Sequence, residues 1–383
     1  MAPTHPSLHL GVTLGGLGSH PRAWRLSPDS ARSWFRADYH LRLARAAEEA
    51  ALDLIYLEDA YALQSDDDRD LRGRLDAALL ASRLAPATSG IGLVPEFTVT
   101  HAEPFHISKS VATLDHASLG RAGWAITTAG AGDRLADQQN DHFGRRPVLS
   151  EQAAYAEAAD VAEVVGRLFD SWEDEAEIRD LSTGRFVDRD KLHYVDFIGD
   201  FFSVKGPSIT PRPPQGRPPT VVPVRTERAI PLAGRYGEIA IVRADDLAAA
   251  GALSERIRTE AERAGRAASI RVLVEFDVLL GRTDDQLTEL KAVLDQDLQD
   301  PPQPRGIGFA GTPAGLADLL AGLDADLDGA LINFAALPSG LAGFTQGVLP
   351  ELVARGRFRD RYRSSTLRER FGLPHPTNIY ATA

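Results

Sequence analysis

Short runs of aliphatic and β-branched residues recur along the chain, and the segments between them repeat their apolar residues every three to four positions. Nearly continuous apolar runs are typical of strands that are buried on both faces, as in a parallel sheet. We predict eight such strands, at residues 8–13, 54–57, 91–98, 123–127, 220–224, 239–242, 270–279 and 330–334.

The segments between the strands have the 3.6-residue period of amphipathic helices. We predict helices at residues 34–51, 74–84, 104–115, 151–171, 246–264, 284–299, 312–323 and 344–355. Strands that alternate with helices form a parallel sheet with helices outside it, and eight repeats favour a closed barrel. The sequence therefore predicts an α/β fold, a (β/α)8 TIM barrel, in which residues 1–383 form a single domain.

The longest stretch without a predicted barrel strand follows the fourth strand and runs from residue 129 to 219. It contains the helix at 151–171, an acidic turn, a hairpin-like segment at 193–205 and a segment rich in Pro and Gly at 206–219. Loops after barrel strands lie at the end of the barrel where TIM barrels bind their ligands. We therefore expect this insertion to cover the C-terminal mouth of the barrel.

The composition narrows the chemistry that is available. The chain has no cysteine and one methionine, Met1, which excludes disulfides, thiolate nucleophiles, zinc ribbons and iron–sulfur clusters. A formal net charge of −12 disfavours a protein that wraps nucleic acid or lies on an anionic membrane. Residues 1–11 have neither the basic nor the continuous apolar region of a secretory signal, so we expect a cytoplasmic protein.

Several common motifs are absent, and one glycine pattern needs interpretation. The chain has no phosphate-binding Gly-Lys-Ser/Thr, no His-Glu-x-x-His and no Gly-x-Ser-x-Gly. Residues 306–311 match the dinucleotide-binding glycine pattern but follow a Pro-rich segment instead of a strand, so we interpret them as a tight entry into the next helix. We interpret the acidic triplet 66–68 as a solvated loop and predict no metal site.

Two candidate residues follow the first two predicted strands. His20 comes after the first strand through a glycine-rich loop at 15–18, which places it at the expected catalytic end of the barrel. The alternative interpretation is that His20 is a structural, hydrogen-bonded histidine. Asp59 closes the second strand, where a barrel would direct it at a ligand, and its alternative is a cap for the following turn.

Three further candidates follow the fifth predicted strand. Arg225, Thr226 and Arg228 stand where a helix start offers free N–H groups, and two guanidinium groups there can neutralise a phosphate. The alternative is ordinary surface charge.

Several long blocks of this sequence carry a resemblance to a known family. They are Gly-Ser-His-Pro-Arg-Ala-Trp-Arg at 18–25, Ala-Thr-Leu-Asp-His-Ala-Ser-Leu-Gly-Arg-Ala-Gly-Trp at 112–124, Leu-Phe-Asp-Ser-Trp-Glu-Asp at 168–174, Phe-Phe-Ser-Val-Lys-Gly-Pro at 201–207 with Pro-Gln-Gly-Arg-Pro at 214–218, and the segments 348–359, 366–369 and 372–373. Together they resemble the nitrilotriacetate / dibenzothiophene-sulfone monooxygenase branch of the bacterial luciferase-like flavin enzymes. The match is collinear from about residue 11 to the C-terminus.

The resemblance implies a TIM barrel that takes reduced FMN from a separate flavin reductase and uses O₂ to oxygenate a small organic substrate. Because the cofactor supplies the redox chemistry, the lack of redox-active side chains is consistent with it. The resemblance also implies site residues. His20 matches a histidine near the reaction zone, Asp59 an acidic residue near the flavin, and Tyr155 a tyrosine of the helix after the insertion. A homodimer or a tetramer is expected.

The chain departs from the family pattern where the family binds flavin. Ala125 stands where the family has Asn, and Glu96 where it has Thr or Ser. The Gln-Ala-Gly-x-Ser phosphate loop is replaced by Val-Pro-Val-Arg-Thr-Glu at 222–227, and Ala154 precedes Tyr155 in place of Arg. Gly306 to Gly308 stand where some members carry a His. We expect Glu96, Ala125, Tyr155, Arg225, Thr226 and Arg228 to lie around the cofactor.

These departures leave three functions open. The first is an FMN-dependent monooxygenase. The second is a homologue that has lost tight flavin binding and serves as a non-catalytic binding or partner subunit. The third is an oxidoreductase of the same superfamily that uses the deazaflavin F420.

Overall fold

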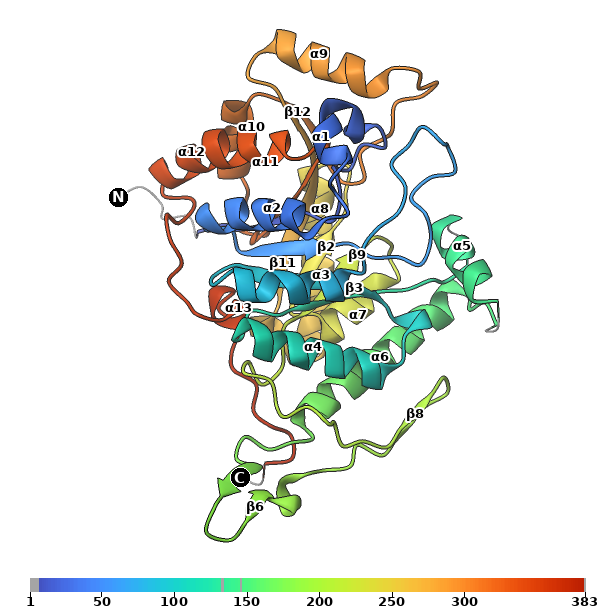
Figure 1. Cartoon of the computed structure of the whole chain (residues 1–383), viewed down its shortest axis with the longest axis vertical. Coiled ribbons are helices and arrows are strands. Elements are labelled where there is room, and N and C mark those ends of the chain that lie inside the picture. The colour runs from blue at the N-terminus through green and yellow to red at the C-terminus, as the bar shows by residue number, and fades with distance from the viewer. Residues whose placement is uncertain (1–6, 132–133, 145–146, 382–383) are drawn as a thin grey trace.

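A computed structural model describes residues 7–131, 134–144 and 147–381, and its centre is a barrel of parallel strands (Figure 1). Residues 1–6, on which part of the expectation about a secretory signal rests, lie outside the described residues. The barrel strands, in chain order, are β1 (His9–Thr13), β2 (Leu54–Leu57), β3 (Gly92–Thr98), β4 (Trp124–Thr127), β9 (Thr220–Val224), β10 (Ile239–Val242), β11 (Arg271–Leu280) and β13 (Gly329–Phe334).

Strand pairing closes the sheet. Each strand pairs in parallel with the strand before it in that order, and β13 pairs with β1, with Leu10 opposite Ala330 and Gly11 opposite Leu331. The predicted (β/α)8 TIM barrel is therefore confirmed. Each predicted strand lies within two residues of an observed one, because buried parallel strands show as continuous apolar runs.

Alternate side chains of the strands fill the barrel interior. Leu54 and Tyr56 of β2, Val94 of β3 and Ala125 of β4 belong to one buried apolar cluster. Residues from near the C-terminus join the same cluster: Leu367, Phe371 and Leu373. They follow the start of α13 (Leu367–Arg370), and they close the barrel at the amino ends of its strands. We call the opposite, carboxyl end of the barrel the mouth.

Helices surround the barrel (Figure 1). They are α1 (Pro28–Ala31), α2 (Ala37–Glu49), α3 (Ala77–Leu84), α4 (Pro104–Ser118), α5 (Arg134–Phe143), α6 (Glu151–Asp170), α7 (Ala229–Tyr236), α8 (Leu247–Arg263), α9 (Asp284–Asp295), α10 (Pro313–Ala321), α11 (Ser339–Gly343), a π-helical turn (Phe344–Val348) and α12 (Leu349–Ala354). The sequence analysis missed α5, which is strongly polar, and α7, which is short and contains Pro231 and Gly234.

The glycine pattern at 306–311 forms a strand, which the sequence analysis did not predict. This strand, β12 (Ile307–Gly311), pairs in parallel with the carboxyl half of β11 and lies beside the closed barrel. Thr312 then caps α10 by accepting the backbone N–H of Gly315, so the glycines do precede a helix, as expected. Gly306 lies so close to Glu275 that an added Cβ would stand 2.2 Å from its carbonyl oxygen, which explains a glycine there.

The segment 129–219 divides into two parts. Its first part contains α5, whose Gln139 accepts the backbone N–H of Tyr61 after β2 and the hydroxyl of Thr98 at the end of β3. This part lies at the mouth, as predicted. After α6 the chain forms two antiparallel pairs, β5 (Glu177–Asp180) with β6 (Arg185–Val187) and β7 (Phe197–Ile198) with β8 (Ser203–Val204).

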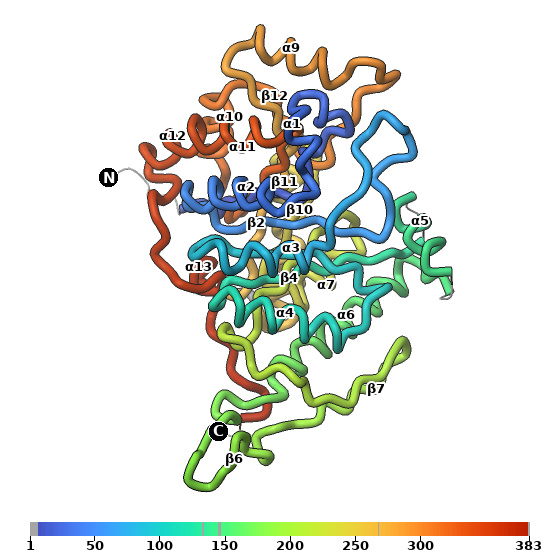
Figure 2. Tube along the Cα trace, in the orientation of Figure 1, coloured from blue at the N-terminus to red at the C-terminus, as the bar shows by residue number. Residues whose placement is uncertain are grey.

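The two pairs lie in different places: β5 and β6 lie beside the C-terminus, whereas the β7–β8 hairpin extends toward the side of the molecule on which α5 lies (Figure 2). We call residues 173–205 the side arm. Val195 and Val204 pack against Val164 and Leu168 near the end of α6, and Figure 2 shows β6 beside the C-terminus, far from α5. The following segment ends where Pro219 accepts the N–H of Trp124 at the start of β4. The part of the insertion that contains α5 thus contacts the mouth directly.

A helix that crosses a lipid bilayer must be both long and apolar. Within the described residues, none is both long and apolar enough to cross a membrane.

Candidate functional site

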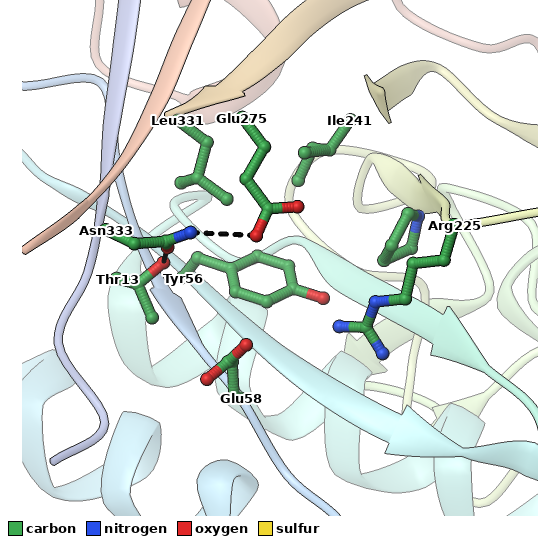
Figure 3. Close-up of a pocket in the computed structure, with 9 residues that line it drawn as sticks. Thr13, Tyr56, Glu58, Arg225, Ile241, Glu275, Leu331 and Asn333 are labelled. Carbon is green, nitrogen blue, oxygen red and sulfur yellow. Dashed lines mark hydrogen bonds between the residues drawn. The ribbon is translucent and has the colours of Figure 1, made fainter. Parts of the chain in front are cut away.

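Polar side chains replace apolar ones in the barrel interior near the mouth. Thr13, Glu58, Arg225, Glu275 and Asn333 line a cavity of about 10 Å³ together with Tyr56 and three apolar residues (Figure 3). A volume of this size holds roughly one water molecule. The residues come from β1, β2, β9, β11 and β13 or from the positions that follow them, so the closure of the barrel brings them together.

One half of this layer is a continuous hydrogen-bonded network. Arg243 donates from Nε and Nη2 to the two carboxylate oxygens of Glu275, at 3.1 Å each. Asn333 donates from Nδ2 to Glu275 at 2.8 Å, and Thr13 donates its hydroxyl to the amide oxygen of Asn333 at 2.6 Å. Fully paired buried networks of this kind fix their members in one arrangement.

A second contact crosses the layer between Glu96 of β3 and Arg225 after β9. Arg225 donates from Nη1 to Oε1 of Glu96 at 3.2 Å. Glu96 is 3% exposed, and its other oxygen, Oε2, has no hydrogen-bond partner among the described residues. The hydroxyl of the buried Tyr56 also has none there. Burial and the nearby Glu96 raise the pKa of Tyr56, so it stays protonated.

A third contact joins Glu58 to Arg305. Arg305 donates from Nη1 to Oε1 of Glu58 at 2.7 Å. The turn before β12 holds Arg305 in place, because Asp277 accepts the backbone N–H groups of Arg305 and Gly306. Burial acts to raise the pKa of Glu58, but Arg305 and Arg225 lower it to about 2. At the mouth, Glu58 is therefore an ionised carboxylate between guanidinium groups.

Sequence analysis missed several residues of this layer: Glu58, Arg243, Glu275, Arg305 and Asn333. For Glu58, Glu275 and Asn333 a signal was available, since alternate residues along each strand face inward and these positions share a face with Tyr56, Leu273 and Leu331. No comparable signal identified Arg305, because this residue lies in the turn before β12 and not on a barrel strand.

Asp59 does not face the cavity. Its Oδ1 accepts the backbone N–H of Ala60 and its Oδ2 that of Ala77, the first residue of α3, both at 2.8 Å. The period of two along β2 turns Glu58 toward the cavity and Asp59 away from it. The alternative, a cap for the following turn, describes its contacts.

His20 also does not line the cavity. Its Nδ1 accepts the backbone N–H of Arg22, and its Nε2 lies 3.3 Å from Asp295 at the end of α9. Burial lowers the pKa of His20, although Asp295 acts in the opposite direction. These contacts describe a structural histidine that holds α9 against the loop after β1, and they do not support the reaction-zone prediction.

Replacing His20 by alanine is expected to lower the free energy of unfolding by about 1–3 kcal/mol, because the N–H of Arg22 and the carboxylate of Asp295 lose a partner. Urea unfolding measures this loss. The rate at which the protein reoxidises reduced FMN should stay unchanged. A slower rate with unchanged stability would return His20 to the reaction zone.

The remaining predicted residues surround the mouth without meeting at one point. Arg228 turns away from Arg225 and its Nε lies 3.2 Å from Oε2 of Glu151, the first residue of α6. Thr226 is exposed, and Tyr155 is half-buried in α6. Ala125 is buried inside the barrel, directly opposite Glu96 on the neighbouring strand. The structure thus joins Arg225 to Glu96 but does not bring Arg225 and Arg228 together on one anion.

Aromatic rings cluster on the outer side of the mouth, next to α5. His101 stacks on Phe143 with ring centres 4.2 Å apart, and Tyr61 meets the edge of Phe143 at 5.0 Å. Tyr61 and Phe143 are exposed. The mouth is thus polar at its centre and apolar at this rim, as small-molecule sites often are.

Comparison with known proteins identifies the family of this chain. Residues 16–316 match the family model described as luciferase-like monooxygenase. The chain belongs to the luciferase-like monooxygenase family. This confirms the resemblance found in the sequence and the prediction of an oxidoreductase enzyme.

Similar proteins match nearly the whole chain. N-acetyl-S-(2-succino)cysteine monooxygenase of Bacillus subtilis (strain 168) is 30% identical over 98% of this chain and 98% of its own. Nitrilotriacetate monooxygenase component A of Aminobacter aminovorans is 29% identical, with the same coverage. Among solved structures, a riboflavin lyase with modified FMN and riboflavin has a TM-score of 0.85 at 27% identity, covering 97% of both chains.

The mouth can be compared with the size and charge of FMN. Its guanidinium groups suit a phosphate, and the hydroxyl of Tyr56, which has no hydrogen-bond partner in the described part of the chain, can donate to a ligand. The cavity, however, has room for roughly one water, and the three fused rings of a flavin do not fit it. This cavity alone therefore does not hold the flavin rings, and the features of the mouth that fit FMN are its guanidinium groups and the Tyr56 hydroxyl.

Proposed function

We propose that the chain is an FMN-dependent monooxygenase that receives reduced FMN from a separate flavin reductase and uses O₂ to oxygenate a small organic substrate. The observation that carries this proposal is the family match over residues 16–316, together with full-length similarity to named monooxygenases. The site proposed for both flavin and substrate is the mouth, where the polar layer lies.

Within this proposal the residues predicted from the sequence surround the cofactor. Glu96, Ala125 and Arg225 lie inside the mouth. Tyr155, Thr226 and Arg228 lie on its border, at the starts of α6 and α7. Asp59 acts through the start of α3, which it caps.

The proposal is tested by mixing the protein with reduced FMN under anaerobic conditions and then with oxygenated buffer. Flavin absorbance follows the reoxidation. A monooxygenase is expected to change the reoxidation rate, saturating as the protein concentration rises, because bound flavin is shielded from solvent. Reoxidation identical to that of free FMN at every protein concentration would contradict the proposal.

A second candidate function is favoured by one specific observation. The ion pair of Glu96 and Arg225 occupies the mouth, which is expected of a homologue that has lost flavin binding and acts as a binding or partner subunit. The same experiment separates the two functions, since such a subunit leaves the reoxidation of free FMN unchanged.

We also propose that the chain forms a single domain and assembles into a homo-oligomer, a dimer or a tetramer. The side arm supports assembly, because its Leu181, Phe186, Tyr194 and Ile198 are exposed large apolar side chains. Light scattering coupled to size-exclusion chromatography measures the oligomeric state. The cytoplasmic location stays a prediction.

A further inference from the structure

We infer that Glu96 and Arg225, called the mouth pair below, determine whether flavin binds: FMN enters the barrel mouth only after the Arg225 guanidinium has left Glu96. This inference rests on the proposed function, because it concerns how the proposed cofactor reaches its site. The contact between Glu96 and Arg225 thus gives both residues a role in controlling cofactor binding.

The mouth pair spans three neighbouring strands. Glu96 belongs to β3 and Arg225 follows β9, while β4 lies between these two strands. Glu96 stands opposite Ala125 of β4, and Ala125 in turn stands opposite Val221 of β9. Arg225 lies four positions beyond Val221, and its long side chain reaches Glu96 across β4. Two departures from the family pattern, at 96 and 225, are therefore parts of a single contact.

The charges of the mouth pair oppose flavin binding while Arg225 is in contact with Glu96. Glu96 is buried, and Arg225 supplies its carboxylate with its one hydrogen bond among the described residues. A buried carboxylate without a partner is costly, so Arg225 is held firmly. FMN is itself an anion and competes with Glu96 for the same guanidinium. Glu96 would also repel the negative charge of reduced flavin.

Arg225 can leave Glu96 without any movement of the barrel. Its side chain is 31% exposed, whereas that of Glu96 is 2% exposed. The guanidinium thus covers Glu96 from the solvent side, and rotation of the flexible side chain is enough to release it. The residue follows β9 in a short loop before α7, so no strand pairing depends on its side chain.

The test is a fluorescence titration of oxidised FMN and riboflavin with the wild-type protein and with Glu96→Thr. The threonine removes the carboxylate and frees Arg225. We expect Glu96→Thr to bind FMN at least tenfold more tightly than wild type. The matched control is Glu175→Thr, which breaks an exposed ion pair with Lys191 in the side arm and leaves FMN affinity unchanged.

A second variant covers the case in which Glu96→Thr does not fold. The double variant Glu96→Thr with Arg225→Gln removes both charges, so no unpaired ion stays behind, and circular dichroism verifies its fold. The double variant removes the contact that blocks the mouth, but it also removes the Arg225 guanidinium that would contact the phosphate of FMN. Its affinity should therefore rise equally for riboflavin and FMN, again at least tenfold.

The outcomes separate this inference from the proposed function. Tight FMN binding by wild type with no gain in either variant overturns the inference and leaves the monooxygenase proposal standing. Binding by the variants alone supports the inference and contradicts FMN as the working cofactor of the wild type. Folded variants and wild type that all fail to bind flavin overturn both.

Discussion

Replacing Phe371 by alanine is expected to lower the free energy of unfolding by about 3–5 kcal/mol. Phe371 is 1% exposed and belongs to the apolar cluster inside the barrel. It stacks on His9 at the start of β1, with ring centres 4.3 Å apart. Truncation therefore leaves a cavity at the closed end, where strands and the C-terminal segment meet.

Urea unfolding measures this loss, and the exposed Phe186 provides the control. Phe186 lies in the side arm and is 61% exposed, so Phe186→Ala should change the free energy of unfolding by no more than about 0.5 kcal/mol. If Phe371→Ala were no more destabilising than Phe186→Ala, the C-terminal segment would not be part of the barrel core.

The second large effect is expected from Asp53, a buried carboxylate between α2 and β2. It accepts the backbone N–H of Leu10 at 2.7 Å and contacts Nδ1 of His9 at 3.1 Å and Nη2 of Arg359 at 2.8 Å. Asp53→Ala leaves the Arg359 charge without its carboxylate, so we expect a loss of about 3–5 kcal/mol in unfolding free energy.

The effect of Asp53 should depend on pH. Burial acts to raise its pKa, but Arg359 and His9 lower it to about 2, below the ordinary value of 3.8. A depressed folded-state pKa contributes stability that is present above the ordinary pKa and is lost as pH falls toward the folded value. The difference between wild type and Asp53→Ala should therefore be constant from pH 5 to 7 and shrink below about pH 4.

The exposed ion pair of Asp29 and Arg32 is the control for this prediction. Asp29→Ala should change the unfolding free energy by less than about 0.5 kcal/mol. A difference between wild type and Asp53→Ala that did not shrink in acid would mean that Asp53 acts through packing and not through its charge.

The barrel could be predicted from the sequence because its strands are buried on both faces. The runs at 54–57 and 239–242 are apolar at every position and match the observed strands in full. The elements that escaped prediction lack this signal. α5 is mostly polar, and β12, which lies beside the closed barrel, has the sequence Ile-Gly-Phe-Ala-Gly with two glycines. Tertiary contacts, not local pattern, determine these two.

The site was less predictable, because it depends on which strands become neighbours. Glu96 and Arg225 were both singled out in the sequence, one as a departure from the family pattern and the other as a phosphate ligand. Their contact depends on β4 lying between β3 and β9, which only the closed sheet order shows. Arg305 reaches Glu58 from a loop more than 240 positions away in sequence, and no local pattern reveals such a contact.

The central claim is that this member of the luciferase-like monooxygenase family uses FMN bound at the barrel mouth. An anaerobic titration of the protein with reduced FMN, with bound flavin measured by rapid ultrafiltration, tests it most directly. The account predicts saturable binding of one FMN per chain to wild type, and tighter binding to Glu96→Thr. Failure of the folded wild type and the folded Glu96→Thr variant to bind reduced FMN would contradict it.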